Sequence, residues 1–314
     1  MKIVSFIIPC YNSEKFIQNT VEDLQNAINR DFSEYKAEII LINDSSKDKT
    51  ESKIEEIAKH STNVITIDMA KNFGQHGAIF AGLAQAKGDI IICLDDDGQT
   101  PPDEAIKLVN ALDENTDVVY ARYKNKKHNK FRNFGSKVND YMAQSLLEKP
   151  KDLFISSYFA MKKYVKDEIL KYTNPYPYLE GLVLRTTNKI KNVDINHKER
   201  KVGKSNYTLR KLLHLWVNGF TSFSVKPLRI AIVCSFIFVI SAIIITLAII
   251  INKIKNPSVP LGWSSTMVVL LIVGSALTFI LGLIGEYVGR IYISINNSPQ
   301  YVVRKVTKND ETKD

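Results

Sequence analysis

Three consecutive carboxylates, Asp95, Asp96 and Asp97, are the residues whose type and spacing point most directly to chemistry. They follow the apolar run Ile90–Leu94, which is typical of a buried β-strand, and Gly98 then begins a turn. Like charges so close together repel one another, and hard divalent cations prefer carboxylate oxygens. The pattern therefore predicts a metal that holds a phosphate group. A solvated acidic turn would explain these three residues equally well when they are taken alone.

Other polar residues follow the remaining predicted strands. Apolar runs alternate with helical patterns, which predicts an α/β domain with a mostly parallel sheet. The predicted strands are Ile3–Ile8, Glu38–Ile42, Val64–Asp68, Ile90–Leu94 and Asp117–Ala121. One predicted helix begins at Ser13, and the others cover 49–60, 78–86 and 103–112. A polar loop at Lys71–Gly77 precedes the helix over 78–86. Ligands of such sheets lie at the carboxyl ends of the strands. We therefore expect one site from the residues at those ends: Tyr11, Asn12, Asp44, Asn72 and Asp95–Asp97.

The charge balance favours anionic partners. The chain has 314 residues, a net charge of +9 and a pI of about 9.2, which suits nucleic acid, anionic lipid or a phosphorylated substrate. The basic segment Arg122–Lys137 contains no acid and directly follows a strand, so Arg122 is expected at the same sheet edge. The three cysteines, Cys10, Cys93 and Cys234, form no metal or disulfide pattern, and the apolar strand-like contexts of the first two favour a reducing compartment. We expect no signal peptide, because the first residues run directly into a strand pattern.

The last third of the sequence predicts a membrane hairpin. Ile230–Ile251 carries no charged residue, and at about 1.5 Å per residue it spans a hydrocarbon layer of roughly 30 Å. A second uncharged run covers 266–285, and the short link 252–265 holds two prolines. The alternative is a buried helix pair of a soluble protein. Lysines and arginines are more frequent outside the hairpin than in its link, so both termini are expected in the cytoplasm.

The segment Leu209–Phe223 interleaves large apolar residues with Arg210 and Lys211. It predicts an amphipathic helix at the membrane surface, or else a helix docked on the domain's own core. The expected organisation is a cytoplasmic α/β domain over 1–206, this helix within 207–227, transmembrane helices at 228–252 and 266–289 around an extracytoplasmic loop at 253–265, and a cytoplasmic tail at 290–314.

Several motifs together resemble a known family. They are Pro9-Cys10-Tyr11-Asn12, the Asp44 turn, Lys71-Asn72-Phe73-Gly74-Gln75-His76, Asp95-Asp96-Asp97-Gly98-Gln99-Thr100-Pro101-Pro102, Arg200-x-x-Gly203-x-Ser205-x-Tyr207 and Gly285-Glu286-Tyr287-x-Gly289-Arg290. The combination is similar to family 2 glycosyltransferases with a GT-A fold, a Rossmann-like nucleotide-sugar domain. Within that family it most resembles the polyprenyl-phosphate glycosyltransferases, which include dolichyl-phosphate mannose synthases and undecaprenyl-phosphate formamidoarabinose transferases.

The resemblance implies inverting transfer of a sugar from a nucleotide-sugar, with UDP as the expected nucleotide, to undecaprenyl phosphate. It implies a Mg²⁺ or Mn²⁺ cofactor, a bacterial inner-membrane location and no nucleic acid partner, and it leaves a homo-oligomer open. The implied metal residues are Asp95, Asp97 and Gln99. The implied nucleotide-binding residues are Pro9, Tyr11, Asn12, Asp44, Asn72, Gly74, Gln75, Asp95 and Asp96. The implied acceptor-phosphate residues are Arg122, Arg132, Ser136, Arg200 and Ser205, and the implied catalytic residues are Asp95, Asp97, Arg122, Arg132 and Arg200.

The sequence also departs from the family pattern. Asn43-Asp44 replaces a pair of acids, and Asp96 replaces a small residue. The segment 151–160 keeps Asp152 but lacks a later arginine, and both this segment and 174–185 are expected to face the sugar or the acceptor. The alternatives are a non-catalytic membrane scaffold and a transferase that acts on another lipid or a growing glycan. A processive polysaccharide synthase is disfavoured because the sequence lacks a Gln-x-x-Arg-Trp motif and a longer membrane channel.

Overall fold

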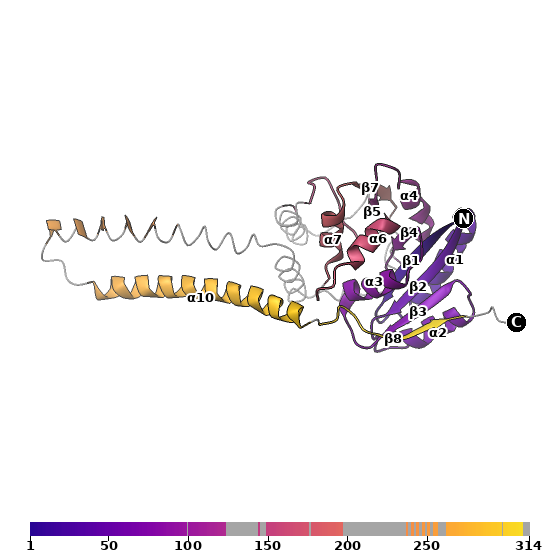
Figure 1. Ribbon diagram of the computed structural model, residues 1–314, viewed down its shortest axis with the longest axis horizontal. Coiled ribbons are helices and arrows are strands. Elements are labelled where there is room, and N and C mark those ends of the chain that lie inside the picture. Colours follow the sequence, from indigo (N-terminus) through magenta and orange to yellow (C-terminus); the bar gives the residue numbers. More distant parts are fainter. Residues whose placement is uncertain are drawn as a thin grey trace. The chain divides into compact units, whose positions relative to one another are not determined.

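The computed structural model divides the chain into two compact units, Met1–Trp216 with Asn297–Asp314, and Val217–Asn296. It describes residues 1–98, 100–123, 144, 149–175, 177–196, 262–296 and 298–309, together with single positions between 237 and 256. The first unit contains the sheet and its covering helices, and the second contains the long helix α10 (Trp263–Ile295) (Figure 1).

Within the described residues, the first unit holds an eight-stranded sheet in the order β7-β5-β6-β4-β1-β2-β3-β8. Its strands are β1 (Lys2–Cys10), β2 (Tyr35–Asn43), β3 (Val64–Met69), β4 (Ile90–Cys93), β5 (Val118–Tyr123), β6 (Phe159–Lys162), β7 (Ile190–Ile195) and β8 (Val303–Lys308). Strands β1 to β4 run parallel to one another, β5 is parallel to β7, and β6 and β8 are antiparallel to their neighbours. The predicted mostly parallel α/β sheet is therefore confirmed.

Helices connect the strands: α1 (Ile17–Asp31), α2 (Thr50–Lys59), α3 (Gly74–Gln85), η1 (Pro102–Glu104), α4 (Ala105–Asn110), α6 (Lys163–Leu170) and α7 (Leu179–Thr186). Helix α3 begins at Gly74, earlier than the predicted start at Ala78, so the predicted loop Lys71–Gly77 is shorter than expected. The reason is a distant residue. The buried carboxylate of Asp44 accepts the backbone N–H groups of Phe73 (2.7 Å) and Gly74 (2.8 Å), which have no partner within the helix.

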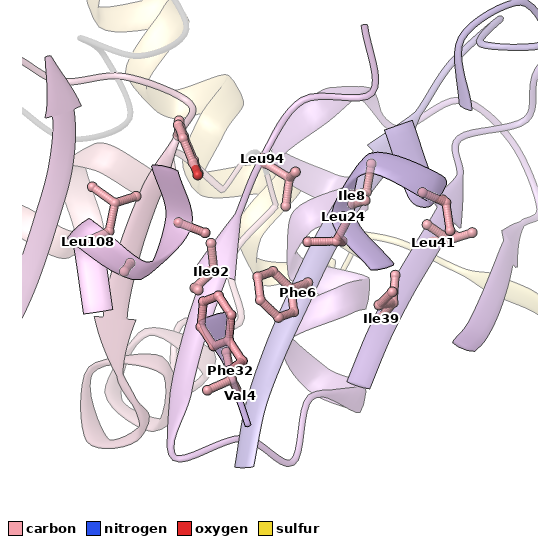
Figure 2. Close-up of a cluster of buried hydrophobic side chains, with 14 of the residues drawn as sticks. Val4, Phe6, Ile8, Leu24, Phe32, Ile39, Leu41, Ile92, Leu94 and Leu108 are labelled. Atoms are coloured by element: carbon pink, nitrogen blue, oxygen red, sulfur yellow. The ribbon is translucent and has the colours of Figure 1, made fainter. Parts of the chain in front are cut away.

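One face of the sheet packs against α1, α2 and α4. Alternate residues of a strand point to the same face, so Val4, Phe6 and Ile8 of β1 lie together with Ile39 and Leu41 of β2 in one cluster (Figure 2). These five side chains are fully buried. The apolar runs that predicted the strands therefore form the core that holds the strand ends in place.

Helix α3 covers the other face at close range. A Cβ atom on Gly82 would lie 2.7 Å from Cγ2 of Ile7 and 2.9 Å from Cδ1 of Ile42. Real Cβ contacts are not this short, so a glycine is required here. The glycine and alanine residues of this helix let it lie directly on β1 and β2.

Helix α10 dominates the described part of the second unit. Its segment Ile272–Ile295 has a mean hydropathy of 1.7 and is long and apolar enough to cross a membrane, and none of it is buried. The predicted second span, 266–289, lies within α10. For the predicted first span, the described positions between Ile237 and Ile251 are helical and exposed.

The segment expected as a tail, 290–314, contains the end of α10 and then strand β8 of the first unit. Strand β8 pairs antiparallel with β3, with Ile65 opposite Lys308 and Asp68 opposite Lys305. The chain therefore returns to the sheet after α10 and forms its edge.

Candidate active site

The carboxyl ends of β1, β2, β3 and β4 meet at one edge of the sheet. In the register of these strands, Cys10 lies opposite Asn43, and Asn43 lies opposite Asp68. The backbone N–H of Asp44 donates to the carbonyl oxygen of Cys10 at 2.9 Å, which joins the turns that follow β1 and β2. The predicted set at the strand ends, Tyr11, Asn12, Asp44, Asn72 and Asp95–Asp97, is thus brought to one edge.

Each carboxylate oxygen of Asp95 accepts a hydrogen bond from a side chain. Oδ1 accepts a hydrogen bond from Nε2 of Gln75 at 3.0 Å, and Oδ2 accepts one from the hydroxyl of Ser157. Gln75 belongs to α3, and Ser157 precedes β6, so two separate elements fix the plane of this carboxylate. The hydroxyl of Thr100 donates to the carbonyl oxygen of Asp95 at 3.1 Å and closes the acidic turn.

Asp96 points back into the domain. Its Oδ2 accepts hydrogen bonds from the backbone N–H of Tyr11 (3.3 Å) and from the hydroxyl of Ser13. Burial raises the pKa of Asp96 to about 6, against the effect of these two hydrogen bonds, and the charges of Asp95 and Asp97 raise it further. The three carboxylates are therefore unequal, and Asp96 ties the end of β4 to the turn after β1.

Two turns with left-handed residues face each other across β1 and β2. Asn12 has φ of 56° and Ser45 has φ of 53°. Asparagine tolerates this conformation, whereas serine occupies a place that favours glycine. The backbone N–H of Asn12 donates to Oγ of Ser46 at 3.0 Å, and the N–H of Lys47 donates to Oδ1 of Asn12 at 2.9 Å. These reciprocal bonds fix the two turns relative to each other. Pro9 lies one residue before the end of β1, which leads into the first of these turns.

Asp44 shapes the neighbouring loop. Besides the two N–H groups at the start of α3, it receives a hydrogen bond from Nδ2 of Asn72 to its carbonyl oxygen at 3.0 Å. Burial raises the pKa of Asp44, and the bonds from Phe73 and Gly74 oppose the rise. Asp44 therefore holds the segment that places Gln75 against Asp95.

Arg122 lies near the end of β5 and pairs with a residue of the edge strand β7. Arg122 and Asp194 are direct partners in the register, and Nε of Arg122 lies 2.6 Å from Oδ1 of Asp194. The Arg122 side chain is half exposed, at 51%. The other predicted residues of the phosphate and metal sets, Gln99, Arg132, Ser136, Arg200 and Ser205, lie outside the described residues.

Comparison with known proteins identifies the family. Residues 5–170 match the model for glycosyl transferase family 2, which is more than half of the chain. The chain belongs to glycosyl transferase family 2. Residues 226–291 of this glycosyltransferase match a second model, the GtrB C-terminal hairpin, so the apolar segment is the hairpin of a membrane-associated transferase.

Two relatives match this glycosyltransferase over nearly its whole length. The uncharacterized glycosyltransferase YkcC of Bacillus subtilis is 33% identical, with 96% of this chain and 93% of the relative covered. An undecaprenyl-phosphate 4-deoxy-4-formamido-L-arabinose transferase of Photorhabdus laumondii is 30% identical, with 100% and 97% covered. The predicted resemblance to this group of transferases is confirmed.

A solved structure shows the same fold. Glucosyl-3-phosphoglycerate synthase from Mycobacterium tuberculosis, in complex with uridine diphosphate, superposes with a TM-score of 0.51 and 17% sequence identity. The match covers 69% of this chain and 76% of the synthase. It confirms the predicted GT-A fold of the first unit.

The residues at the acidic turn suit a divalent cation that is shared with a substrate phosphate. The described residues contain no cluster of three or more histidine, cysteine or acidic side chains that could enclose an ion. Mg²⁺ does not need one, because it is commonly held by one or two carboxylates, substrate phosphates and water. Gln75 and Ser157 donate hydrogen bonds to the Asp95 carboxylate. They are the kind of outer partners that orient a carboxylate ligand.

The sequence did not point to several residues of the site. Asp194 was not predicted, and Ser157 was expected only within the segment 151–160, because their partners are distant in sequence and no motif marks them. Glu180, expected only within a segment facing sugar or acceptor, lies with Oε2 3.8 Å from Nδ1 of His76. These two atoms, like the hydroxyl of the buried Tyr120, are buried and have no hydrogen-bond partner among the residues that the structure describes. His76 adjoins Gln75, so α7 reaches the helix that holds Asp95.

Proposed function

We propose that this glycosyltransferase transfers a sugar from a UDP-linked donor to undecaprenyl phosphate, with inversion at the anomeric carbon. Two features support the proposal together. The acidic turn lies at the same strand edge as the turns around Asn12 and Asp44, and the chain also carries the hairpin. The relative from Photorhabdus laumondii, named for transfer to undecaprenyl phosphate, matches across both parts.

Asp95 and Asp97 would hold the metal together with the donor diphosphate. A bound Mg²⁺ or Mn²⁺ ion would neutralise charge that builds on the departing diphosphate. Gln75 and Ser157 keep the Asp95 carboxylate in one orientation, so little reorganisation is needed when the donor binds. Gln99 is part of the same proposed set.

The nucleoside would lie along the turns after β1 and β2. Asn12 and Ser46 hold these turns together, and Asp44 fixes the loop that carries Asn72 and Gly74. These contacts are made by backbone and short polar side chains, so the surface is formed before the donor arrives. We assign Pro9, Tyr11, Asn12, Asp44, Asn72, Gly74, Gln75 and Asp96 to this surface.

The acceptor phosphate needs no strong base, because it is already an anion at neutral pH. One of its oxygens attacks the anomeric carbon, the bond from that carbon to the diphosphate oxygen breaks, and UDP leaves with the electron pair. Attack from the side opposite the leaving group inverts the anomeric centre. Orientation and charge neutralisation then supply the acceleration.

Arginines would bind the acceptor phosphate. A guanidinium group matches phosphate oxygens in two places, and Asp194 orients that of Arg122 in the absence of substrate. We place Arg132, Ser136, Arg200 and Ser205 in the same group. The hairpin would bring the lipid to this domain from the inner membrane, with both termini in the cytoplasm.

The test is a donor screen with membranes from cells that produce the protein. Membranes are incubated with radiolabelled UDP-sugars, undecaprenyl phosphate and MgCl₂ or MnCl₂, and then extracted with chloroform. The expected product is a labelled lipid whose mass equals undecaprenyl phosphate plus one sugar. Absence of such a product with every donor would overturn the proposal. Membranes containing the Asp97→Ala variant show whether the host makes the lipid itself.

A further inference from the structure

Strand β8 reaches the proposed nucleoside surface through its arginine. The backbone N–H of Ala70 donates to the carbonyl oxygen of Val302 at 2.9 Å, which extends the β3–β8 pairing beyond the strands. The register shifts here, since Asp68 lies opposite Lys305 and Met69 lies opposite Val303. Arg304 is therefore the additional residue of a β-bulge, a feature that redirects a side chain.

The bulge lets consecutive residues of β8 reach the same helix. Nη2 of Arg304 lies 2.8 Å from Oε1 of Glu51, and Nζ of Lys305 lies 2.6 Å from Oε1 of Glu55. Glu51 and Glu55 are one turn apart on α2. The two cations differ in one respect, because Arg304 also donates through Nε to Oδ2 of Asp68, whose side chain is only 6% exposed.

Asp68 connects Arg304 to the end of β2. Its Oδ1 accepts a hydrogen bond from Nδ2 of Asn43 at 2.6 Å, so the carboxylate lies between Arg304 and Asn43. Because Asn43 donates through its amide nitrogen, its Oδ1 is turned toward the following turn. That oxygen accepts the backbone N–H of Ser46 at 3.1 Å.

Ser46 completes the connection to the turn after β1. Its hydroxyl oxygen accepts the backbone N–H of Asn12 at 3.0 Å, and Asn12 is one of the two residues held in the left-handed region. A continuous series of hydrogen bonds therefore runs from Arg304 through Asp68, Asn43 and Ser46 to Asn12. The adjacent Tyr11 bonds to Asp96 of the acidic turn at 3.3 Å.

We propose that Arg304 is a positioning residue for the nucleoside of the donor, acting through Asp68 and Asn43 on the turns at Ser46 and Asn12. The inference rests on the proposed function, which places the nucleoside along those turns. Arg304 itself touches no reacting atom. It neutralises the buried Asp68 carboxylate and fixes the direction in which that carboxylate receives Asn43. A segment that follows the membrane hairpin thereby contributes to donor binding.

The matched variants are Arg304→Met, Lys305→Met and Glu51→Gln. All three remove a charge from an ion pair between β8 and α2, but only Arg304→Met removes the bond to Asp68. Purified full-length protein is titrated calorimetrically with UDP in the presence of MgCl₂. We expect Arg304→Met to raise the Kd for UDP about tenfold, because a charged hydrogen-bond partner is lost. Lys305→Met and Glu51→Gln should change it less than about twofold.

Steady-state kinetics distinguish a specific effect of Arg304 on donor binding from a general loss of structure in the domain. Arg304→Met should raise the KM for the donor sugar nucleotide and leave the KM for undecaprenyl phosphate unchanged. If Arg304→Met does not fold, Arg304→Lys keeps a cation beside Asp68 without the guanidinium fork, and a smaller rise in the Kd for UDP is expected from it.

Three results would overturn the inference. One is a Kd for UDP that Arg304→Met, or Arg304→Lys in its place, leaves unchanged. Another is an equal rise in all three matched variants, which would show that β8 acts only by covering the sheet. The third is a wild-type protein that transfers sugar but binds no nucleoside diphosphate. A wild type that neither transfers sugar nor binds UDP or GDP would instead identify the proposed function as the part that fails.

Discussion

Nε2 of Gln75 donates a hydrogen bond to Oδ1 of Asp95 at 3.0 Å, and it links the start of α3 to the end of β4. The second oxygen of Asp95 accepts the hydroxyl of Ser157, which precedes β6. A carboxylate with a donor on each oxygen cannot turn freely. The geometry of the acidic turn is therefore set by residues on both sides of β4 and not by the turn alone.

Replacing either donor should weaken metal use more than folding. We expect Gln75→Ala and Ser157→Ala each to raise the Mg²⁺ concentration for half-maximal transfer by about tenfold, because outer partners of a metal ligand typically contribute 10–100-fold. The measurement is transfer activity over a Mg²⁺ titration. Gln18→Ala is the control, since the Gln18 amide bonds only to Glu22 on the surface of α1 in the described contacts. An unchanged Mg²⁺ requirement in both variants would show that Asp95 is not a metal ligand.

Asp96 and Asp97 should respond differently to the same substitution. Asp97→Asn is expected to lower kcat by about 100-fold or more (~2.7 kcal/mol), because a proposed ligand loses its charge. Asp96→Asn keeps an oxygen that can accept from Tyr11 and Ser13, so we expect activity within about fivefold of the wild type. Kinetics of both purified variants check the contrast. Equal losses would mean that Asp96 takes part in the chemical step and not only in the nucleoside surface.

Transfer activity should require the planar guanidinium group of Arg122 and not only its positive charge. We expect Arg122→Ala to lower kcat/KM by about 100-fold, and Arg122→Lys to recover only a small part of that loss, since a lysine cannot bind two phosphate oxygens in parallel. The assay is transfer at varied undecaprenyl phosphate. Arg30→Ala removes a comparable exposed pair, with Asp31 on α1, and should leave the rate unchanged. Full activity of Arg122→Lys would mean that Arg122 contributes only its positive charge and not two parallel hydrogen bonds to the acceptor phosphate.

The contact of α3 with the sheet predicts an effect on stability. In Gly82→Ala the new methyl group would meet Ile7 and Ile42 at less than 3 Å. We expect the free energy of unfolding to fall by about 1–3 kcal/mol, as is usual for overpacked cores. Thermal or denaturant unfolding measures it. Ala84→Ser adds an atom at an exposed position of the same helix and should change stability by less than about 0.5 kcal/mol. A Gly82→Ala protein as stable as the wild type would show that α3 can move away from β1.

The sequence allowed the central strands to be predicted because their apolar runs are buried on both faces. Val64–Met69 is buried at every position, and Ile90–Cys93 likewise. The edge strands lack this signal. Ile190–Ile195 is mostly half-buried and includes Lys191 and Asp194, while Val303–Lys308 is mostly exposed. Their place in the sheet depends on partners far away in sequence, so neither was predicted.

The same limit applies to the site. Strand alternation predicted that the turns after β1 to β4 share an edge, because parallel strands end on one side. It could not predict Ser157, since β6 enters the sheet between β4 and β5 out of sequence order. Arg304 was one of the lysines and arginines outside the hairpin that predicted its orientation. Its pairing with Asp68 depends on a bulge that no pattern in the sequence marks.

The position of β8 has a consequence for how the protein is made. Until residues 303–308 are synthesised, the N–H and C=O groups along the outer side of β3 have no strand beside them, and such open edges readily pair with other chains. The partners Asp68 and Arg304 are separated by 236 positions, and both hairpin segments come between them. The sheet can therefore be completed only after the membrane segment has left the ribosome, which makes its last edge a late step in folding.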